Sequence, residues 1–529
     1  MKTPRNTTFI SMADNGQYWH HGFEFCLRNL FDKLDRSISI SININVDGLP
    51  IFKSSLKNFW PILCSVQEFP EMPPFAVGIY YGTAKPKDAS EFLTPFIDEL
   101  LPILEAGMTV NGYLITVKIR CFICDSPARA FIKGVTSFNG KFGCLKCTTK
   151  GQYLHITNTM VYPDINATKR TDEDFREKKY LDHQRRDTPL TKLPIDLIED
   201  VIVSDSLHLL ELGVMKKLLT SWRTGKMTNK AKWSTFEKAK ISEFLVNVRF
   251  PSEIHRRMRS LEFVSLWKGL EYRSFLNYVG IVILKSYLPE KYYDNFVYLY
   301  CAIRICSANK YKHLLPVARC LFNDFINSFK SLYGVEYVTS NIHNLCHVVD
   351  EVERFGDLST LSAYPFENYL HTLKKLLKAG PNPLAQVANR ISENMNAGES
   401  FSFEEQIISK SPISVEKTKK ICKITFPSFI LSTACKDRWF LSKSLKIVCV
   451  VNIIESKNDW KIEGQHLLNQ ADFFSKPFKS SVIHIYVANQ NLKNRSKNNL
   501  YECSAIMCKL VAISCADGTV FIPLIHTLN

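Results

Sequence analysis

Three carboxylates in this sequence have the residue types and the placement that metal-dependent chemistry needs. Asp47 follows a strictly alternating run at 37–47, and Asp125 follows a long apolar run at 113–124. Glu367 lies in the aromatic segment Tyr-Pro-Phe-Glu-Asn-Tyr-Leu at 364–370, at the start of a predicted helix. Carboxylates among apolar residues are usually paired or bound to a metal. Two strand-end aspartates and a helical glutamate suit two Mg²⁺ or Mn²⁺ ions, with Asp47 bridging both.

Each of these carboxylates also has a structural interpretation. Asp47 precedes Gly48, so that it can be an ordinary turn residue. Asp125 precedes Ser126 and Pro127, so that it can cap the helix that the proline opens. In a purely structural protein, the three carboxylates would never meet.

Two further pairs of residues have the spacing of zinc ligands. Cys144 and Cys147 form a Cys-x-x-Cys turn beside glycines, and His343 and His347 are four residues apart on one helical face. One Zn²⁺ held by these four side chains would be structural, because a closed four-ligand site leaves no position for substrate. It would join the segment after the second aspartate to the helix before the glutamate.

Asp205 and His208 are three residues apart on one face of a predicted apolar helix. They can pair with each other or reach the active centre. The alternative is a capping aspartate beside a histidine of the core.

Basic residues follow Glu367 on the predicted helices, namely Lys374, Lys375, Lys378 and Arg390. We expect them to contact DNA phosphates, which would make binding salt-dependent. A solvated helix face is the alternative.

Composition agrees with a globular protein that binds a polyanion. The 529 residues are 46% apolar and 22% charged, and 67 Lys and Arg exceed 51 Asp and Glu. No apolar run approaches the ~18 residues of a membrane span, and no signal core opens the chain. We therefore expect no membrane partner. The sixteen cysteines show no disulfide framework, which predicts mostly buried thiols.

The pattern of predicted elements is α/β. Strands are expected at 37–47, 59–66, 75–81 and 113–124, with a helix at 90–105. Helical periodicity dominates 230–349, and short strand-like runs dominate the C-terminal part. The predicted parts are an N-terminal segment 1–36, a core at 37–147, a mainly helical insertion 148–350, final core helices 351–398, a linker 399–420 and a β-rich C-terminal module 421–529.

The motifs occur in an order that resembles the transposases of CACTA (EnSpm) DNA transposons. The resemblance covers residues 38–393. The motifs are Val46-Asp47-Gly48-Leu-Pro, Asp125 followed by Gly143-Cys144-Leu-Lys-Cys147, Asp205-Ser-Leu-His208, His343-x-x-x-His347 and Tyr364-Pro-Phe-Glu367-Asn-Tyr. The Cys and His residues are also similar to the zinc arrangement in the catalytic subunit of the V(D)J recombinase.

The resemblance implies an RNase H-like mixed sheet whose DDE triad is Asp47, Asp125 and Glu367, with Asp205 and His208 as an accessory motif. It implies two-metal cleavage and strand transfer at transposon ends, in the nucleus, by a homo-oligomer. The implied partners are transposon-end and target DNA, with no small-molecule substrate.

The sequence departs from the family at its N-terminal end. Only 46 residues precede Asp47, whereas family members often carry DNA-binding elements there. The alternative function is therefore a truncated or domesticated derivative that binds DNA or protein without cutting. The intact triad favours the catalytic interpretation.

Overall fold

The computed structural model describes residues 10–13, 16–52, 56–378, 381–397, 412, 414–418, 421–456 and 459–528, which form an α/β protein. The chain divides into two compact units. Unit 1 comprises Met1–Leu209 and Ser359–Glu405, and unit 2 comprises Leu210–Leu358 and Gln406–Asn529. The expected insertion begins at 148, but residues 148–209 belong to unit 1. Most of the expected linker 399–420 lies outside the described residues.

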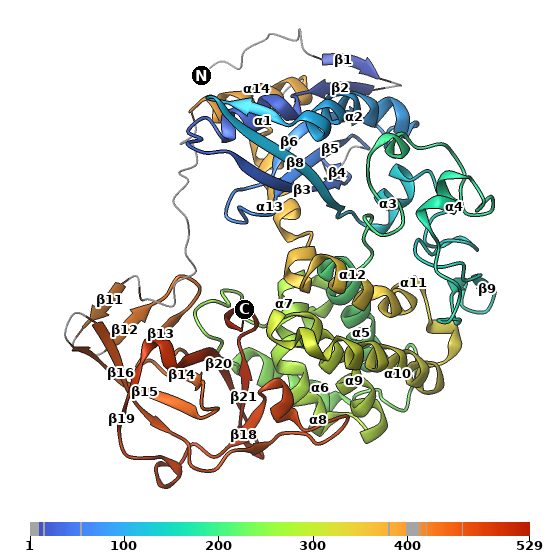
Figure 1. Ribbon diagram of the computed structural model, residues 1–529. Helices are drawn as coiled ribbons and strands as arrows, with labels where there is room; N and C mark the ends of the chain where they lie inside the picture. The colour runs from blue at the N-terminus through green and yellow to red at the C-terminus, as the bar shows by residue number, and fades with distance from the viewer. Residues whose placement is uncertain are drawn as a thin grey trace. The chain divides into compact units, whose positions relative to one another are not determined.

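Unit 1 is built on a mixed sheet (Figure 1) with the order β1-β2-β6-β5-β3-β8-β7, in which β4 pairs with β5. Strands β3 and β8 run parallel, whereas the other paired neighbours run antiparallel. The strands are β1 (Ile10–Ala13), β2 (Gly16–His20), β3 (Ile38–Val46), β4 (Leu49–Pro50), β5 (Asn58–Val66), β6 (Phe75–Gly82), β7 (Met108–Val110) and β8 (Tyr113–Phe122). The predicted strands of this region are thereby confirmed.

Strand β3 follows from its alternating sequence. Ile40, Ile42 and Ile44 are all fully buried on the face that joins the hydrophobic core. The opposite face carries Asn43 and Asn45, which are also buried. The end of β3 is therefore covered on both faces, as is typical of a strand inside a mixed sheet.

Helices complete unit 1. They are α1 (Phe23–Leu30), α2 (Ala89–Ala106), α3 (Ser126–Ile132), α4 (Asp172–Arg176), α13 (Tyr364–Leu376) and α14 (Pro383–Ala397). The long helix α2 connects β6 to β7 and β8, and the Asp88 side chain caps it by accepting from Ser90 N. Residues 148–209 are mostly irregular and include a small hairpin of β9 (Gln152–Leu154) and β10 (Thr159–Val161).

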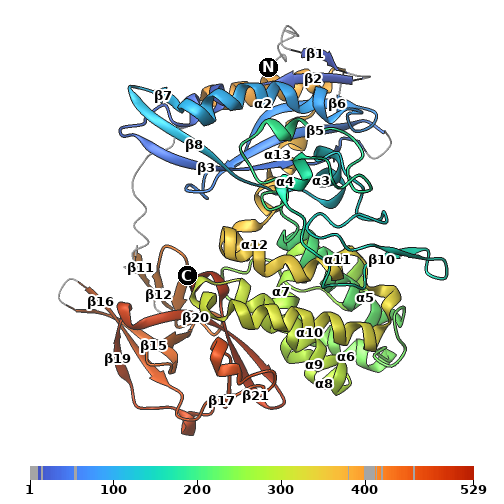
Figure 2. The same cartoon turned by 45° about the vertical axis from the view of Figure 1, so that its right-hand side comes forward.

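The helical part of unit 2 begins within a π-helix at Ser206–Met215. The helices that follow are α5 (Lys216–Thr224), α6 (Thr235–Asn247), α7 (Gly269–Ser274), α8 (Gly280–Tyr287), α9 (Glu290–Cys306), α10 (Leu315–Tyr333), α11 (Ser340–His343) and α12 (Val348–Phe355). Helices α9 and α10 lie side by side (Figure 2), where Asn295 donates to Phe325 O at 3.0 Å. None of the helices in the described ranges is long and apolar enough to cross a bilayer.

The C-terminal part of unit 2 is β-rich, as predicted. One sheet has the order β11-β12-β13 and the other the order β17-β18-β21-β20-β14-β15-β16-β19. The strands are β11 (Ser414–Lys417), β12 (Cys422–Thr425), β13 (Ile430–Ser432), β14 (Trp439–Ser442), β15 (Ile447–Ser456), β16 (Asp459–His466), β17 (Ala471–Asp472), β18 (Tyr486–Ala488), β19 (Asn499–Glu502), β20 (Ile506–Cys515) and β21 (Gly518–Pro523).

A buried ion cluster joins this β-rich part to the helical part of the same unit. The Lys509 side chain is fully buried, and its Nζ lies 2.6 Å from Asp437 Oδ1 and 2.8 Å from Glu253 Oε2. Asp437 also accepts from Ser252 N at 2.8 Å. Burial alone would raise the pKa of Asp437, but these partners hold it below its usual value. The cluster therefore fixes the C-terminal strands to the segment after α6.

Candidate functional site

Parallel pairing of β3 with β8 brings Asp47 and Asp125 to the same edge of the sheet. Ile44 pairs with Phe122, and Ile123 N donates to Ile44 O at 2.8 Å. Each aspartate follows its paired strand residue by three positions. Their common location therefore follows from strand register.

Both aspartates also have the local roles that the structural alternatives predict. Asp47 Oδ1 accepts from Gly48 N at 2.6 Å in the turn after β3. Asp125 is the N-cap of α3, and its Oδ1 accepts from Ala128 N at 2.8 Å. Both bonds use only Oδ1, and a carboxylate has a second oxygen that can bind a metal. The turn and cap roles therefore do not exclude metal ligation.

Glu367 lies in the first turn of α13, where Pro365 is tolerated because the first helical N–H groups have no partner within the helix. Phe366 packs into the core, whereas the Glu367 side chain is 39% exposed. Glu367 is thus turned toward solvent and is not enclosed by its aromatic neighbours.

The three carboxylates influence one another electrostatically. Burial, and then the negative charges of Asp125 and Glu367, raise the pKa of Asp47 to about 7. The Gly48 N–H and the His208 charge oppose this rise only in part. Asp125 and Glu367 thus both act electrostatically on Asp47, although 242 residues separate Asp125 from Glu367 in the sequence.

Asp205 and His208 connect the π-helix to the helix that carries Glu367. The Asp205 side chain is fully buried, and its Oδ1 accepts from Ala363 N, just before α13, at 2.8 Å. Its Oδ2 contacts His208 Nδ1, and His208 Nε2 lies 3.5 Å from Glu367 Oε1. Burial alone would lower the pKa of His208, but the two carboxylates raise it to about 10. Mutual pairing and contact with the candidate site are both observed. Asp205 also caps the π-helix, as the structural alternative predicts, by accepting from Leu207 N and His208 N at 3.2 Å each.

Sequence reasoning missed residues that hold the start of α13. Arg120 in β8 donates to Asn43 Oδ1 at 2.9 Å and to Thr360 Oγ1 at 2.8 Å. Thr360 lies only a few residues before Glu367. The available signal was the pair of asparagines in β3, because Asn is unfavourable in strands unless its side chain has partners.

The predicted phosphate-binding residues occupy different environments. Lys374, Lys375 and Lys378 are exposed, and Lys374 donates to Pro50 O at 2.8 Å. Arg390 is half-buried and donates to Leu376 O, so that it joins α14 to the end of α13. Lys374 and Arg390 thus form hydrogen bonds to backbone carbonyl groups within unit 1.

The Cys-x-x-Cys turn in unit 1 presents both sulfurs to one point. Cys144 and Cys147 are buried, and their sulfur atoms lie 3.5 Å apart. Arg170 holds the turn by donating from Nε to Cys144 O at 3.2 Å. Two thiolates bound tetrahedrally to one Zn²⁺ at ~2.3 Å would be about 3.8 Å apart. The observed sulfur–sulfur distance is therefore close to that of two thiolates bound to the same Zn²⁺.

The histidine pair in unit 2 has a similar arrangement. His343 and His347 are buried, and their Nε2 atoms lie 3.4 Å apart. Imidazole nitrogens bound tetrahedrally at ~2.0–2.1 Å would be about 3.3–3.4 Å apart. Each buried pair is thus arranged so that it could supply two ligands to a metal ion.

The C-terminal part of the chain matches a known protein family. Residues 407–524 match a family model described as a domain of unknown function, DUF8592. This match covers the β-rich C-terminal part and none of the candidate site. No curated protein matches the chain.

Proposed function

We propose that this protein is a DDE-type transposase with an RNase H-like core, which cuts DNA at transposon ends and transfers the strands to target DNA. The observation that carries the proposal is that β3 and β8 bring Asp47 and Asp125 to one edge of the sheet, where the charge of Glu367 also acts on Asp47. A mixed sheet with in-register parallel strands that each lead into an aspartate supports the RNase H-like part.

The donor set fits Mg²⁺ or Mn²⁺. Asp47, Asp125 and Glu367 offer hard carboxylate oxygens, and their mutual repulsion favours a bound cation. Two such ions, when bound, would stabilise the attacking and leaving oxygens of a phosphodiester. Asp47, on which both other carboxylates act electrostatically, would bind both ions.

The chain's own residues orient this carboxylate set. Asp205 accepts from the backbone just before α13, and His208 contacts the Glu367 carboxylate. Both contacts restrain Glu367 beside the aspartates. The exposed Lys375 and Lys378 would bind phosphates of the DNA.

A structural Zn²⁺ is the second proposed metal. Its ligands would be Cys144, Cys147, His343 and His347, whose Cys and His pairs each have nearly the spacing of tetrahedral ligands. Four protein ligands would close the coordination sphere, so that this ion would take no part in cleavage.

The proposed reaction sets the expected partners and location. Transposon-end and target DNA would be the substrates, a homo-oligomer would hold the two ends, and the protein would act in the nucleus. The basic net charge of +16 supports a polyanionic partner.

The test is metal-dependent nicking of DNA that carries the element's ends. Asp125→Asn should lower nicking by about 100-fold or more, since it removes a ligand from ions that contribute several kcal/mol. Asp187→Asn is the matched control, because the Asp187 side chain is exposed and pairs with Lys178 on the surface. Wild-type protein that binds DNA but never nicks it would favour the non-catalytic derivative. Equal nicking by wild type and Asp125→Asn would refute the assigned triad.

A further inference from the structure

The connection between α5 and α6 in unit 2 is strongly basic. Lys226, Lys230 and Lys232 are all exposed, and residues 225–233 contain no acidic side chain. Within the described chain, none of these three lysines has an ion pair. The connection therefore presents uncompensated positive charge at the N-terminal end of α6.

A second group of cations follows the C-terminal end of α6. Arg249, Arg256 and Arg257 are exposed. Arg256 lies 3.5 Å from Glu271, a carboxylate that Arg259 already binds at 2.6 Å. Positive charge is therefore in excess here too.

The acidic residues of this region are mostly occupied within the protein. Residues 216–273 contain fourteen basic and five acidic side chains. Glu237 caps α6, Glu253 pairs with Lys509, and Glu271 pairs with Arg259. Most of the negative charge of this region is thus neutralised within the protein, and net positive charge remains on its surface.

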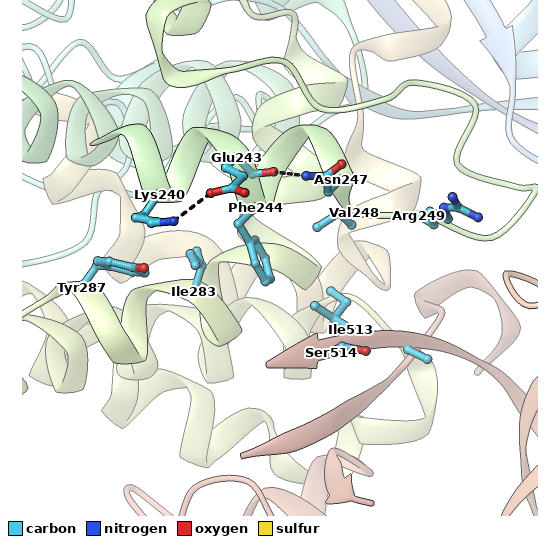
Figure 3. Close-up of a pocket in the computed structure, with 11 residues that line it drawn as sticks. Lys240, Glu243, Phe244, Asn247, Val248, Arg249, Ile283, Tyr287, Ile513 and Ser514 are labelled. Carbon is cyan, nitrogen blue, oxygen red and sulfur yellow. Dashed lines mark hydrogen bonds and ion pairs between the residues drawn. The ribbon is translucent and has the colours of Figure 1, made fainter. Parts of the chain in front are cut away.

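Hollows that contain basic residues flank α6. One hollow of about 520 Å³ lies between α6, α8 and β20, and Figure 3 shows Lys240 and Arg249 at its opposite ends. Another of about 470 Å³ on the α5 side of α6 is lined by Arg223 and Lys238. Lys240 is paired with Glu243 at 3.1 Å, and Glu262 also lines the second hollow, so that the unpaired positive charge lies mainly beyond the two ends of α6.

The dimensions suit a DNA duplex. The 13 residues of α6 span ~20 Å, which is a little over half of the ~34 Å helical repeat of B-DNA. Lys232 and Arg249, which flank the two ends of α6, are therefore separated by roughly one such repeat or less. Lysine is depleted in protein–protein interfaces, whereas it is a common phosphate contact. Nucleic acid is thus favoured over an acidic protein.

We propose that this α6 basic surface binds the phosphate backbone of double-stranded DNA without sequence preference. The surface is defined by Lys226, Lys230, Lys232, Arg249, Arg256 and Arg257. It is a DNA-binding site of unit 2 that contains none of the three carboxylates in unit 1. It gives the region outside the carboxylate site a role that does not require cleavage.

The test compares two triple variants of the full chain that have the same net charge. The first replaces Lys226, Lys230 and Lys232 with Glu, and the control replaces the exposed Lys443, Lys493 and Lys497 with Glu. Binding of a 30-base-pair duplex of unrelated sequence is measured by fluorescence anisotropy in EDTA between 50 and 200 mM salt. The slope of log K against log[salt] should become shallower by about 0.9 per lost contact, or by up to ~2.7, only in the first variant.

Equal losses in both triple variants, or no loss in either, would overturn the proposal. Polyglutamate of matched charge serves as a competitor, and displacement as effective as that by duplex DNA would identify an acidic protein as the occupant instead. Because EDTA prevents metal-dependent cleavage, binding is measured independently of nicking. A protein that fails to nick but shows the expected slopes keeps this surface and loses only the proposed catalysis.

Discussion

At the scale of single residues, a proton and the proposed metal ion would compete for the Asp47 carboxylate. The neighbouring carboxylates and burial raise its pKa to about 7, far above the ordinary value of 3.8. Near neutral pH without metal, a substantial share of Asp47 is therefore protonated. A divalent cation must displace that proton, so that metal binding should strengthen as pH rises.

This competition predicts how stability depends on pH. Since the folded pKa of Asp47 is raised, its contribution is fully present below about pH 4 and is lost as pH rises through about 7. In EDTA, Asp47→Asn should therefore be more stable than wild type at pH 8, by on the order of 1–2 kcal/mol after solvent screening. Thermal unfolding at pH 5 and pH 8 measures this, and a gain of the same size at both values would contradict the assigned cause.

Asp205 provides a second prediction, because it positions Glu367 and would not touch the DNA. Asp205→Asn keeps a side-chain acceptor for Ala363 N but removes the negative charge beside His208. Loss of a partner that orients a ligand typically costs 10- to 100-fold in metal affinity or activity. The Mn²⁺ concentration for half-maximal nicking should rise by about tenfold, whereas Asp187→Asn should leave it unchanged. An unchanged Mn²⁺ requirement in Asp205→Asn would argue against the positioning role.

At the scale of elements, the anchor between the helical and β-rich parts of unit 2 depends on one lysine. Lys509 is fully buried against Asp437 and Glu253. Removal of one partner from a buried ion pair leaves an uncompensated charge and typically costs 3–5 kcal/mol.

Lys509→Met should therefore lower the free energy of unfolding by about 3–5 kcal/mol, measured by urea denaturation. Lys443→Met on the exposed surface should change it by less than about 0.5 kcal/mol. Asp437→Asn added to Lys509→Met should recover part of the loss, since one buried charge disappears with it. A loss of similar size in Lys443→Met would show that the effect is not specific to the buried cluster.

The sequence predicts elements whose pattern is local. Strand β3 and helix α10 could be predicted because their apolar residues recur with the period of one buried face. The burial of Lys509 could not be predicted from the sequence, because its partners Asp437 and Glu253 lie 72 and 256 residues away. The inclusion of residues 148–209 in unit 1 likewise depends on packing that no local pattern encodes.

The candidate site was predictable to a similar extent. Strand ends marked Asp47 and Asp125, because an in-register parallel pair carries its end residues to one edge. The solvent exposure of Glu367 could not be read from its aromatic neighbours, since a helix turns adjacent side chains in different directions. The buried role of Asn45, which donates to Ile123 O at 2.7 Å, depends on pairing across 78 residues.

At the scale of the whole molecule, the proposed zinc ion would take two ligands from residues 144–147 and two from residues 343–347. Purified protein should contain about one equivalent of zinc, and Cys144→Ser should lose it. Cys121→Ser is the matched control, because Cys121 and Cys124 have the same spacing but Cys121 lies in β8. Elemental analysis measures the zinc, and equal zinc in wild type and Cys144→Ser would remove this site.

The division of unit 1 into two sequence segments also sets the order in which the ribosome delivers its carboxylates. Asp47 and Asp125 emerge early, but Glu367 emerges only after residues 210–358 of unit 2 have been made. At ~5–20 residues per second, Glu367 follows Asp125 by roughly 10–50 s. A nascent chain or a prematurely terminated product thus holds two carboxylates without the third. The interruption of unit 1 therefore delays the complete set of proposed metal ligands until residues 210–358 have been made.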